Sequence, residues 1–508
     1  MPRKGKCFST CRKRPKPECK PSECYYTNGN KYKYCRLAFT HKMGKDCIPV
    51  QRNPNHRKTT KDHSTKEKIE EFRTKYAKKI ATRKIARFLR KTDPRVRSKF
   101  LQSVCSDSGV CIAFGKHADA IRKHFSDFND FELLSKPINR IGAVSANGFV
   151  KEFTYEHRGY VANAILKSSS KKSSDNLLYE AMVGFFLNKH SKHLPNFLDT
   201  YGLYEYNNYT IYYNFLNNKT NAKSFVKIAL SRIAKNETDI TDDQIRASCE
   251  HPTNMAVLIQ HLKGAETVKE KLKDVNFIKN DLAYVLFQVY MALYTLGDTF
   301  THYDLHHQNV LVYEPVKGKY IEYHYHLDNG SKLIFRSPYI AKIIDYGRCY
   351  YNDKGNDSKA FREKMCKICV TPACGAGSGY TWLNTESTSD NYFISSKIHH
   401  PGHDLRLLVY TRADVKYDTN RPLEHVMNSV IYGEGVKKEA IWYGTKPNKK
   451  SGLPSRIQNV SDAYKALLKH VNDADVMKLN DANYGDETNR LGQLHVYHDH
   501  RPMRYVSE

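Results

Sequence analysis

Two runs of residues place carboxylate and amide groups at a spacing that suits phosphoryl transfer. The first, His302–Asn309, has the form H-x-D-x-x-x-x-N and precedes a short apolar stretch. The second places Asp345 at the end of another apolar stretch, with Gly347 two positions later. In this chemistry a carboxylate meets the acceptor hydroxyl, while an amide oxygen reaches a metal on the phosphate chain. The sequence therefore predicts Asp304 as the catalytic acid–base residue and Asn309 as a metal ligand, with Asp345 supplying a second carboxylate.

The apolar stretches around these groups predict the elements that must position them. Apolar residues repeat every two positions in strands and every three to four in helices. Strands are expected at 162–167, 209–215, 256–262, 310–313 and 341–344, and helices at 177–187, at 281–296 and at 462–471. The insertion 313–337 is rich in Tyr and His and is expected to form a β-hairpin. Asp304, Asn309 and Asp345 would therefore lie beside the ends of short strands.

Positive charge is concentrated near the start of the chain. The formal net charge of the 508 residues is +29, and residues 1–100 carry +23 of it, with 31 Lys and Arg against 8 Asp and Glu. Residues 64–90 also contain apolar residues at helical spacing, which predicts a basic amphipathic helix. A basic block attracts polyanions such as nucleic acid, and a solvated tail is the simpler alternative. Residues 1–100 are therefore a candidate arm for contact with nucleic acid or another polyanion.

Neither a signal peptide nor a membrane span is expected. The start, Met1–Lys4, leads into charged residues, and the longest apolar run, 282–296, is too short to cross a bilayer. An intracellular protein is therefore expected, in which the 13 Cys would be free thiols or metal ligands. A zinc site and free thiols both remain open for the one set with zinc-like spacing, Cys366, Cys369 and Cys374.

The two motifs, in this order and each at a strand boundary, resemble the eukaryotic-type protein kinase superfamily over about residues 135–410. The chain is most similar to the atypical haspin-like kinases, which share Asp-Leu-His at 304–306, an insertion before the metal aspartate, and Ile-Asp-Tyr at 344–346. The segment 106–111 and the basic, Cys-containing arm also resemble kinase-like proteins of large nucleocytoplasmic DNA viruses. The resemblance implies an α+β, bilobal kinase-like fold with a β-rich N-lobe, a mostly α C-lobe and a basic N-terminal extension.

Changes in composition, together with this resemblance, divide the chain into five parts. They are a basic Cys-rich arm expected to be disordered (1–63), a basic helical extension (64–130), a kinase N-lobe (131–262), a kinase C-lobe (263–475) and a C-terminal tail (476–508). The catalytic residues would then lie between the two lobes.

The resemblance also assigns the residues that would bind the phosphates of ATP. Lys167 ends the strand whose lysine binds the α- and β-phosphates, and Glu180, in the following helix, would be its ion-pair partner. Gly142 and Gly148 would let backbone amides approach the phosphates, although the middle glycine of G-x-G-x-x-G is absent. Asp345 would hold Mg2+ together with Asn309.

Further roles follow from the same resemblance. A strand and turn near residue 260 resemble the kinase hinge, so the backbone of Gln260 and Leu262 would bind adenine and Glu266 would reach the ribose. His306 replaces the usual catalytic-loop lysine; it could bind the γ-phosphate and would make the activity sensitive to pH. Asp404 belongs to a segment that would brace the catalytic loop.

Three functions remain open at this point. The leading prediction is an ATP- and Mg2+-dependent Ser/Thr protein kinase of viral origin, located in the host cytoplasm or nucleus or in the virion. Its substrate would be a chromatin-type or viral protein, by analogy alone. The Asp-Leu-His pattern also resembles aminoglycoside and choline phosphotransferases, which act on small molecules. An inactive kinase-like protein that binds nucleic acid or belongs to the virion is the third prediction, and the basic arm favours it.

Overall fold

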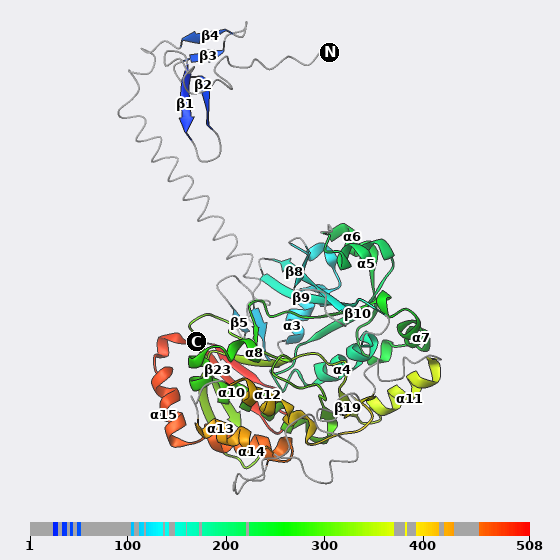
Figure 1. Ribbon diagram of the computed structural model, residues 1–508, viewed down its shortest axis with the longest axis vertical. Coiled ribbons are helices and arrows are strands. Elements are labelled where there is room, and N and C mark those ends of the chain that lie inside the picture. Colours follow the sequence, from blue (N-terminus) through cyan, green and yellow to red (C-terminus); the bar gives the residue numbers. More distant parts are fainter. Residues whose placement is uncertain are drawn as a thin grey trace. The chain divides into compact units, whose positions relative to one another are not determined.

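The structure, a computed structural model, contains helices and antiparallel sheets together, so the fold class is α+β (Figure 1). It describes residues 24–28, 33–37, 41–43, 48–51, 103–105, 111–115, 118–135, 138–141, 148–158, 160–171, 175–219, 223–369, 381–383, 393–415, 421–430 and 457–507. The chain divides into two compact units, Met1–Leu89 and Arg90–Glu508. The helix predicted at 64–90 lies outside the described residues.

In the first unit, the described residues form two short antiparallel pairs. β1 (Cys24–Asn28) pairs with β2 (Lys33–Leu37), and β3 (His41–Met43) pairs with β4 (Pro49–Gln51). Tyrosines in β1 and β2 favour extended backbone, because aromatic side chains pack well on a pleated surface. Strands therefore occur within residues 1–63, where the composition predicts disorder.

The second unit contains a six-stranded antiparallel sheet with the order β11-β10-β12-β9-β8-β7 (Figure 1). Its strands are β7 (Asn139–Ile141), β8 (Gly148–His157), β9 (Tyr160–Ser169), β10 (Thr200–Tyr206), β11 (Leu230–Ala234) and β12 (Met255–Gln260). β9 and β12 contain most of the two strands predicted at 162–167 and 256–262. Both lie in the interior of the sheet, which explains their continuous apolar sequences.

The alternation of side chains along β9 decides where Lys167 points. One face of the sheet packs against aromatic residues of the segment 125–131 and receives Ala162, Ala164 and Leu166. Because successive side chains of a strand point to opposite faces, Lys167 points to the other face. That face is covered by α4 (Leu177–His190), which packs against β10 and β12.

The rest of the second unit is built around α10 (Leu282–Leu296). Every residue of α10 except Tyr294 is buried, and Gly297, at φ 56°, ends the helix as predicted. Among the described residues, no helix is long and apolar enough to cross a membrane. The other helices are α3 (Ala118–His124), α5 (Tyr209–Leu216), α6 (Lys223–Ala229), α7 (Asp242–Glu250), α8 (Val268–Lys271), α9 (Val275–Asn280), α11 (Ser358–Ile368), α12 (Arg406–Asp414), α13 (Arg421–Asn428), α14 (Val460–Val471) and α15 (Ala474–Asn483).

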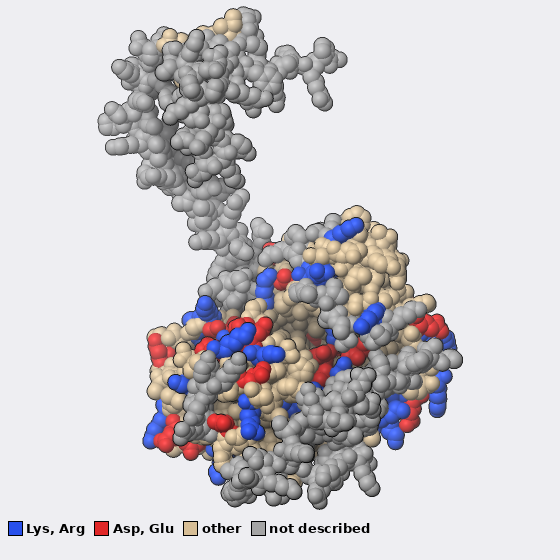
Figure 2. Space-filling model, in the orientation of Figure 1, with Lys and Arg blue, Asp and Glu red and all other residues tan. Residues whose placement is uncertain are grey.

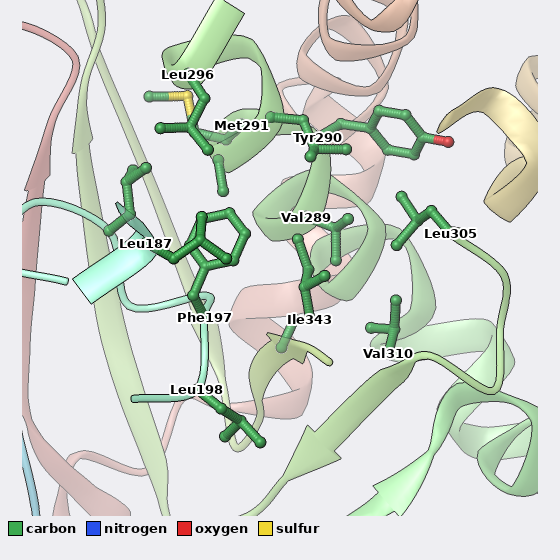
Figure 3. Packing of buried hydrophobic residues seen from close by; sticks show 14 of the residues in the cluster. Leu187, Phe197, Leu198, Val289, Tyr290, Met291, Leu296, Leu305, Val310 and Ile343 are labelled. Atoms are coloured by element: carbon green, nitrogen blue, oxygen red, sulfur yellow. The ribbon is translucent and has the colours of Figure 1, made fainter. Parts of the chain in front are cut away.

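Short strands bring the predicted catalytic residues onto α10. β15 (Val310–Tyr313) pairs with both β13 (Glu266–Thr267) and β18 (Ile340–Ile343). Figure 3 shows Leu305, Val310 and Ile343 converging beside Val289 of α10, and all four side chains are fully buried. The core therefore fixes the run 302–309 and the end of β18 relative to one helix.

The insertion forms the predicted hairpin, and the C-terminal tail extends it into a sheet. β16 (Tyr320–His326) and β17 (Lys332–Ser337) are antiparallel. β23 (Arg490–Tyr497) adds to β16 in parallel, and β24 (Arg504–Ser507) adds to β23. The remaining strand pairs are β5 (Ser103–Cys105) with β6 (Cys111–Ala113), β14 (Phe300–Thr301) with β19 (Tyr350–Asp353), β19 with β20 (Asn356–Asp357), and β21 (Thr381–Leu383) with β22 (Phe393–Ser395).

The strand predicted at 209–215 is wrong, because this segment is the helix α5. Asn208 caps the helix by accepting a hydrogen bond from Thr210 N at 2.9 Å. Ile211, Tyr212 and Phe215 are buried on one side of it, a spacing that fits a helix. A short apolar run with tyrosines matches both periods, so periodicity alone could not decide.

The expectation of a free thiol or metal ligand at Cys369 is also wrong. Cys369, at the end of α11, is bonded to Cys249 of α7, with a Cα–Cα distance of 6.0 Å. The two cysteines are 120 positions apart, so no local spacing could indicate the pair. The bond joins α11 to a helix that packs on α4.

A close contact fixes the position of α4 on the sheet. Gly184 of α4 lies against Thr200 of β10, where an added Cβ would come within 2.1 Å of the threonine Oγ1. Beside it, Asn188 donates to Thr200 O at 2.7 Å and accepts from Thr200 N at 2.9 Å. Only a glycine lets the helix approach the strand this closely, and the helix carries Glu180.

We predict that Gly184→Ala lowers the free energy of unfolding by about 1–3 kcal/mol, because the methyl group overpacks the contact. Combining it with Thr200→Ala should recover part of this loss, since the obstructing hydroxyl is removed. Urea unfolding of the single and double variants measures the coupling. Strictly additive losses would contradict the contact.

Candidate active site

Lys167 lies between two carboxylates that come from distant parts of the sequence. Its Nζ is 2.8 Å from Glu180 Oε2 in the first turn of α4, and 2.8 Å from Asp345 Oδ1, just beyond β18. Asn176 caps α4 by accepting a hydrogen bond from Tyr179 N at 3.0 Å. The ion pair predicted between Lys167 and Glu180 is therefore present, and Asp345 extends it into a three-residue cluster.

Electrostatics keep the central pair of this cluster ionised. Burial alone would lower the pKa of Lys167, but the carboxylates of Asp345 and Glu180 outweigh it and raise that pKa. The Lys167 ammonium lowers the pKa of Asp345 to about 2. Burial raises the pKa of Glu180, whose side chain is 4% exposed, and Lys167 partly offsets this rise. Asp345 is thus a carboxylate at neutral pH, with its charge available to a cation.

A buried carboxylate holds the backbone at the start of the run 302–309. Asp404 Oδ2 accepts a hydrogen bond from His302 N at 2.8 Å, and Asp404 Oδ1 accepts one from Tyr303 N at 3.0 Å. Asp404 is 2% exposed and lies in the turn that leads into α12. Burial raises its pKa, while the His302 ring and the two amide donors oppose the rise. The expected contact between Asp404 and this loop is therefore present.

Each carboxylate oxygen of Asp304 contacts a different guanidinium group. Arg348 Nη1 donates to Asp304 Oδ2 at 3.1 Å, and Arg406 Nη1 donates to Asp304 Oδ1 at 3.2 Å. Arg406 also donates to Tyr303 O at 3.3 Å. Charge-assisted hydrogen bonds of this kind fix the orientation of a carboxylate more firmly than neutral ones.

Asn309 and Asp345 lie at adjacent strand ends, as a shared metal ion would require. Asn309 precedes β15 and Asp345 follows β18, and Ile344 N donates to Asn309 O at 3.0 Å. Asn309 Nδ2 donates to Asp304 O at 2.9 Å, so the amide oxygen is the atom that Asn309 can offer a metal. Within the described ranges, no group of three or more His, Cys, Asp or Glu could hold a metal. Mg2+ commonly takes one or two protein ligands and completes its shell with phosphate and water, so this pair fits it.

Two residues of the site have left-handed backbone conformations that are unusual for residues other than glycine. Tyr303 has φ 65° and Asp345 has φ 70°. Such conformations cost on the order of 1–3 kcal/mol and persist only where surrounding contacts impose them. The Tyr303 hydroxyl donates to Ile398 O at 2.6 Å, in addition to the amide bond to Asp404, and Asp345 is held by Lys167.

His306 does not have the titration behaviour expected from its sequence position. Burial lowers the pKa of its ring to about 4, so the ring is neutral at pH 7. Its Nδ1 accepts a hydrogen bond from Gln308 N at 3.2 Å, which leaves the proton on Nε2, 3.9 Å from Asp304 Oδ1. Desolvation therefore disfavours the charged form of the ring, and the pH-sensitive activity expected from His306 stays a prediction.

The residues predicted to bind adenosine lie at the end of β12, in the turn after it and in β13. Gln260 ends β12, and its backbone N donates to Asp199 O at 2.8 Å, while Leu262 O accepts a bond within the following turn at 3.1 Å. Adenine would therefore have to bind the other backbone atoms of these residues, Gln260 O and Leu262 N. Glu266 is 52% exposed, with Oε2 3.2 Å from Lys271 Nζ.

Of the two glycines predicted to approach phosphate, the structure describes only Gly148. Gly142 lies outside the described residues. Gly148 begins β8, where an added Cβ would come within 2.1 Å of Ser168 O in β9. Its lack of a side chain is therefore required by strand packing.

Three charged residues of the site were not singled out from the sequence. Arg348 and Arg406 contact Asp304, and Asp175 lies 3.5 Å from Arg348 through its Oδ2. A Cβ at Gly347 would be 3.4 Å from Asp175 Cβ, which is an ordinary van der Waals contact, so this approach does not require a glycine. The positions of both arginines, just after Gly347 and two residues after Asp404, were a signal, whereas Asp175 lies in a serine-rich stretch without one.

We predict that Asp404→Ala lowers the free energy of unfolding by about 2–4 kcal/mol, because two buried amides lose a charged acceptor. Asp404→Asn keeps one acceptor oxygen and should lose about half as much. Urea unfolding at pH 7 compares them. Unfolding midpoints equal to that of the unmodified chain would refute the anchoring role.

A cavity of about 1140 Å3 lies elsewhere, among α10, α13, α14 and α15, and none of the predicted site residues lines it. No model of a known protein family matches the chain. No curated protein matches it either. The cluster around Lys167, Asp304 and Asp345 is therefore the feature from which a function can be argued.

Proposed function

We propose that this chain is an ATP- and Mg2+-dependent phosphotransferase of the protein kinase type, acting on Ser or Thr hydroxyls of a protein. The observation that carries the proposal is the position of Lys167 between Glu180 and Asp345, at 2.8 Å from each carboxylate. A lysine on a strand, a glutamate on the next helix and an aspartate before Tyr-Gly meet in the order that such enzymes require. In this proposal the six-stranded sheet with α4 is the N-lobe, and the elements around α10 are the C-lobe.

The residues would divide the work of binding the nucleotide. Lys167, oriented by Glu180, binds the α- and β-phosphates. Asp345 and the amide oxygen of Asn309 hold Mg2+, which when bound neutralises charge on the phosphates. Because Asp345 is ionised and Lys167 is protonated at neutral pH, both partners are ready for these roles.

The transfer step needs little rearrangement of protein groups. Asp304 accepts the proton of the acceptor hydroxyl while the oxygen of that hydroxyl attacks the γ-phosphorus of ATP. The bond between that phosphorus and the β–γ bridging oxygen breaks, and ADP leaves with the electron pair. Arg406, whose side chain is 4% exposed, keeps the Asp304 carboxylate oriented. Positioning and charge neutralisation, rather than covalent chemistry, would supply most of the acceleration.

The likeness to haspin-like and viral kinase-like proteins belongs to the same proposal. Asp-Leu-His at 304–306 and Asp-Tyr-Gly at 345–347 support it. The Tyr346 hydroxyl donates to Ile343 O at 2.8 Å and accepts from Leu198 N at 2.9 Å, so tyrosine is a well-bonded occupant of this position. A chromatin-type or viral protein remains the proposed substrate, with the host cell interior or the virion as the place of action.

A second function, binding to nucleic acid or another polyanion, is favoured by the charge of residues 1–100. They carry +23 of the net +29. On the face of the second unit in Figure 2, the described Lys and Arg side chains are interspersed with Asp and Glu and do not gather into one basic area. We propose that the arm tethers the enzyme to a polyanion through these charges.

We predict that Asp304→Asn lowers the transfer of labelled phosphate from ATP to a mixture of histones and casein by about 100-fold or more, because the amide cannot accept the proton. Binding of ATP should persist. Label in a soluble metabolite instead of protein would favour the small-molecule alternative, and full activity of the variant would exclude Asp304 as the acid–base residue.

Asp353→Asn is a matched control for this variant. Asp353 is also a partly exposed aspartate in an ion pair, with Lys189, and it lies outside the candidate site. It should retain activity, so a loss in Asp304→Asn alone would not reflect the removal of any charged aspartate.

We predict that Asp345→Ala weakens ATP binding in the presence of Mg2+ by about tenfold or more, because a metal ligand is lost. In the presence of a chelator, the variant and the unmodified chain should bind ATP with similar affinity. Calorimetry under both conditions measures the difference. A Mg2+-dependent affinity unaffected by the substitution would argue against Asp345 as a ligand.

A further inference from the structure

The two arginines that contact Asp304 differ in how far they are enclosed. The side chain of Arg406 is 4% exposed and is also bonded to backbone, so its position is set by the core. The side chain of Arg348 is 22% exposed, and it also contacts the carboxylate of Asp175 at 3.5 Å. Arg348 is therefore the arginine whose guanidinium is both exposed to solvent and in contact with carboxylates of the site.

Arg348 also lies close to the metal side of the site. It follows Asp345 by three residues, and its positive charge is one of the causes that lower the pKa of Asp345. Gly347 lies in the turn between Asp345 and Arg348, next to Asp175. The guanidinium thus contacts the carboxylate proposed to meet the acceptor, and it is three residues along the chain from the carboxylate proposed to hold the metal.

Among the described residues, the Asp304 carboxylate forms ion pairs with two arginines, Arg348 and Arg406, and Arg406 is the more enclosed of the two. His306 Nε2 is 3.9 Å from Asp304 Oδ1, beyond hydrogen-bond distance, and its Nδ1 accepts a hydrogen bond from Gln308 N at 3.2 Å. Lys167 is engaged by Glu180 and Asp345. Phosphoryl transfer spreads negative charge over the equatorial oxygens, and a positioned cation there accelerates it strongly.

We propose that Arg348, held beside Asp304, binds the γ-phosphoryl group of the nucleotide. This inference rests on the proposed phosphotransferase function and names the residue that recognises the transferred group. A guanidinium presents several N–H donors in one plane, so it can keep one bond to Asp304 while others bind phosphate oxygens. Without nucleotide, Asp304 and Asp175 hold Arg348 in place.

The proposal predicts a defect that depends on the γ-phosphate. Arg348→Gln should weaken binding of a non-hydrolysable ATP analogue with Mg2+ by about tenfold or more, the size of one charge-assisted hydrogen bond. Its affinity for ADP with Mg2+ should change by less than about twofold, because ADP lacks the group that Arg348 contacts. Arg348→Lys keeps the charge and should restore part of the preference for the ATP analogue. Calorimetry on the full chain measures both affinities.

Arg336→Gln is the matched control. Arg336 is 20% exposed, forms ion pairs with carboxylates, and lies on β17 away from the site. It should leave the ratio of the two affinities unchanged. If Arg348→Gln does not fold, Arg348→Lys carries the test, since losing the planar fork should still weaken the ATP analogue selectively.

Two results would overturn the assignment of Arg348. An unchanged ratio of ATP-analogue to ADP affinity would show that it does not contact the γ-phosphate, and equal weakening of both would show a structural role only. If the unmodified chain binds neither nucleotide with Mg2+, the proposed function itself fails. If it binds both and only the ratio test fails, the proposed function stands without Arg348.

Discussion

The ammonium group of Lys167, placed between Glu180 and Asp345, is the interaction on which the rest of the site depends. Removing an ammonium and two carboxylates from bulk water is costly unless each has a partner. The alternation along β9 points Lys167 toward α4, the Asn176 cap sets the first turn of that helix, and β18 delivers Asp345. Moving β9 and α4 apart would leave the buried Glu180 carboxylate without Lys167, and the contact of Lys167 with the partly exposed Asp345 joins the sheet to the end of β18.

Asp404 positions the other half of the site, which is the loop that carries Asp304. It binds two successive backbone amides and so holds Tyr303 in a left-handed conformation that aims Asp304 at its guanidinium partners. The cost of that conformation is offset by charged hydrogen bonds in a dry environment. Groups fixed in this way need little reorganisation when charge develops during a reaction, which is the general basis of electrostatic catalysis.

Much of the local structure was predictable, and the failures have identifiable causes. Long apolar or strictly alternating runs correctly indicated β9, β12, β15, β18, α4 and α10, as well as the hairpin of β16 and β17. The helix α5 was mistaken for a strand because a short aromatic run satisfies both periods. The parallel pairing of β23 with β16 and the bond between Cys249 and Cys369 join segments more than 100 residues apart, and no local pattern encodes them.

The sequence by itself marked the candidate groups, because Asp304, Asn309 and Asp345 lie beside short strands at a spacing that would suit phosphoryl transfer. The resemblance added Lys167 and Glu180 to them. Tertiary structure decided their states and their neighbours. Burial lowers the pKa of the His306 ring, and folding brought Arg348 into contact with both Asp304 and Asp175. Charge states depend on desolvation and on distances across the fold, which residue order does not contain. The candidate catalytic groups can thus be identified from local sequence. Their electrostatic environment is set only in the folded structure.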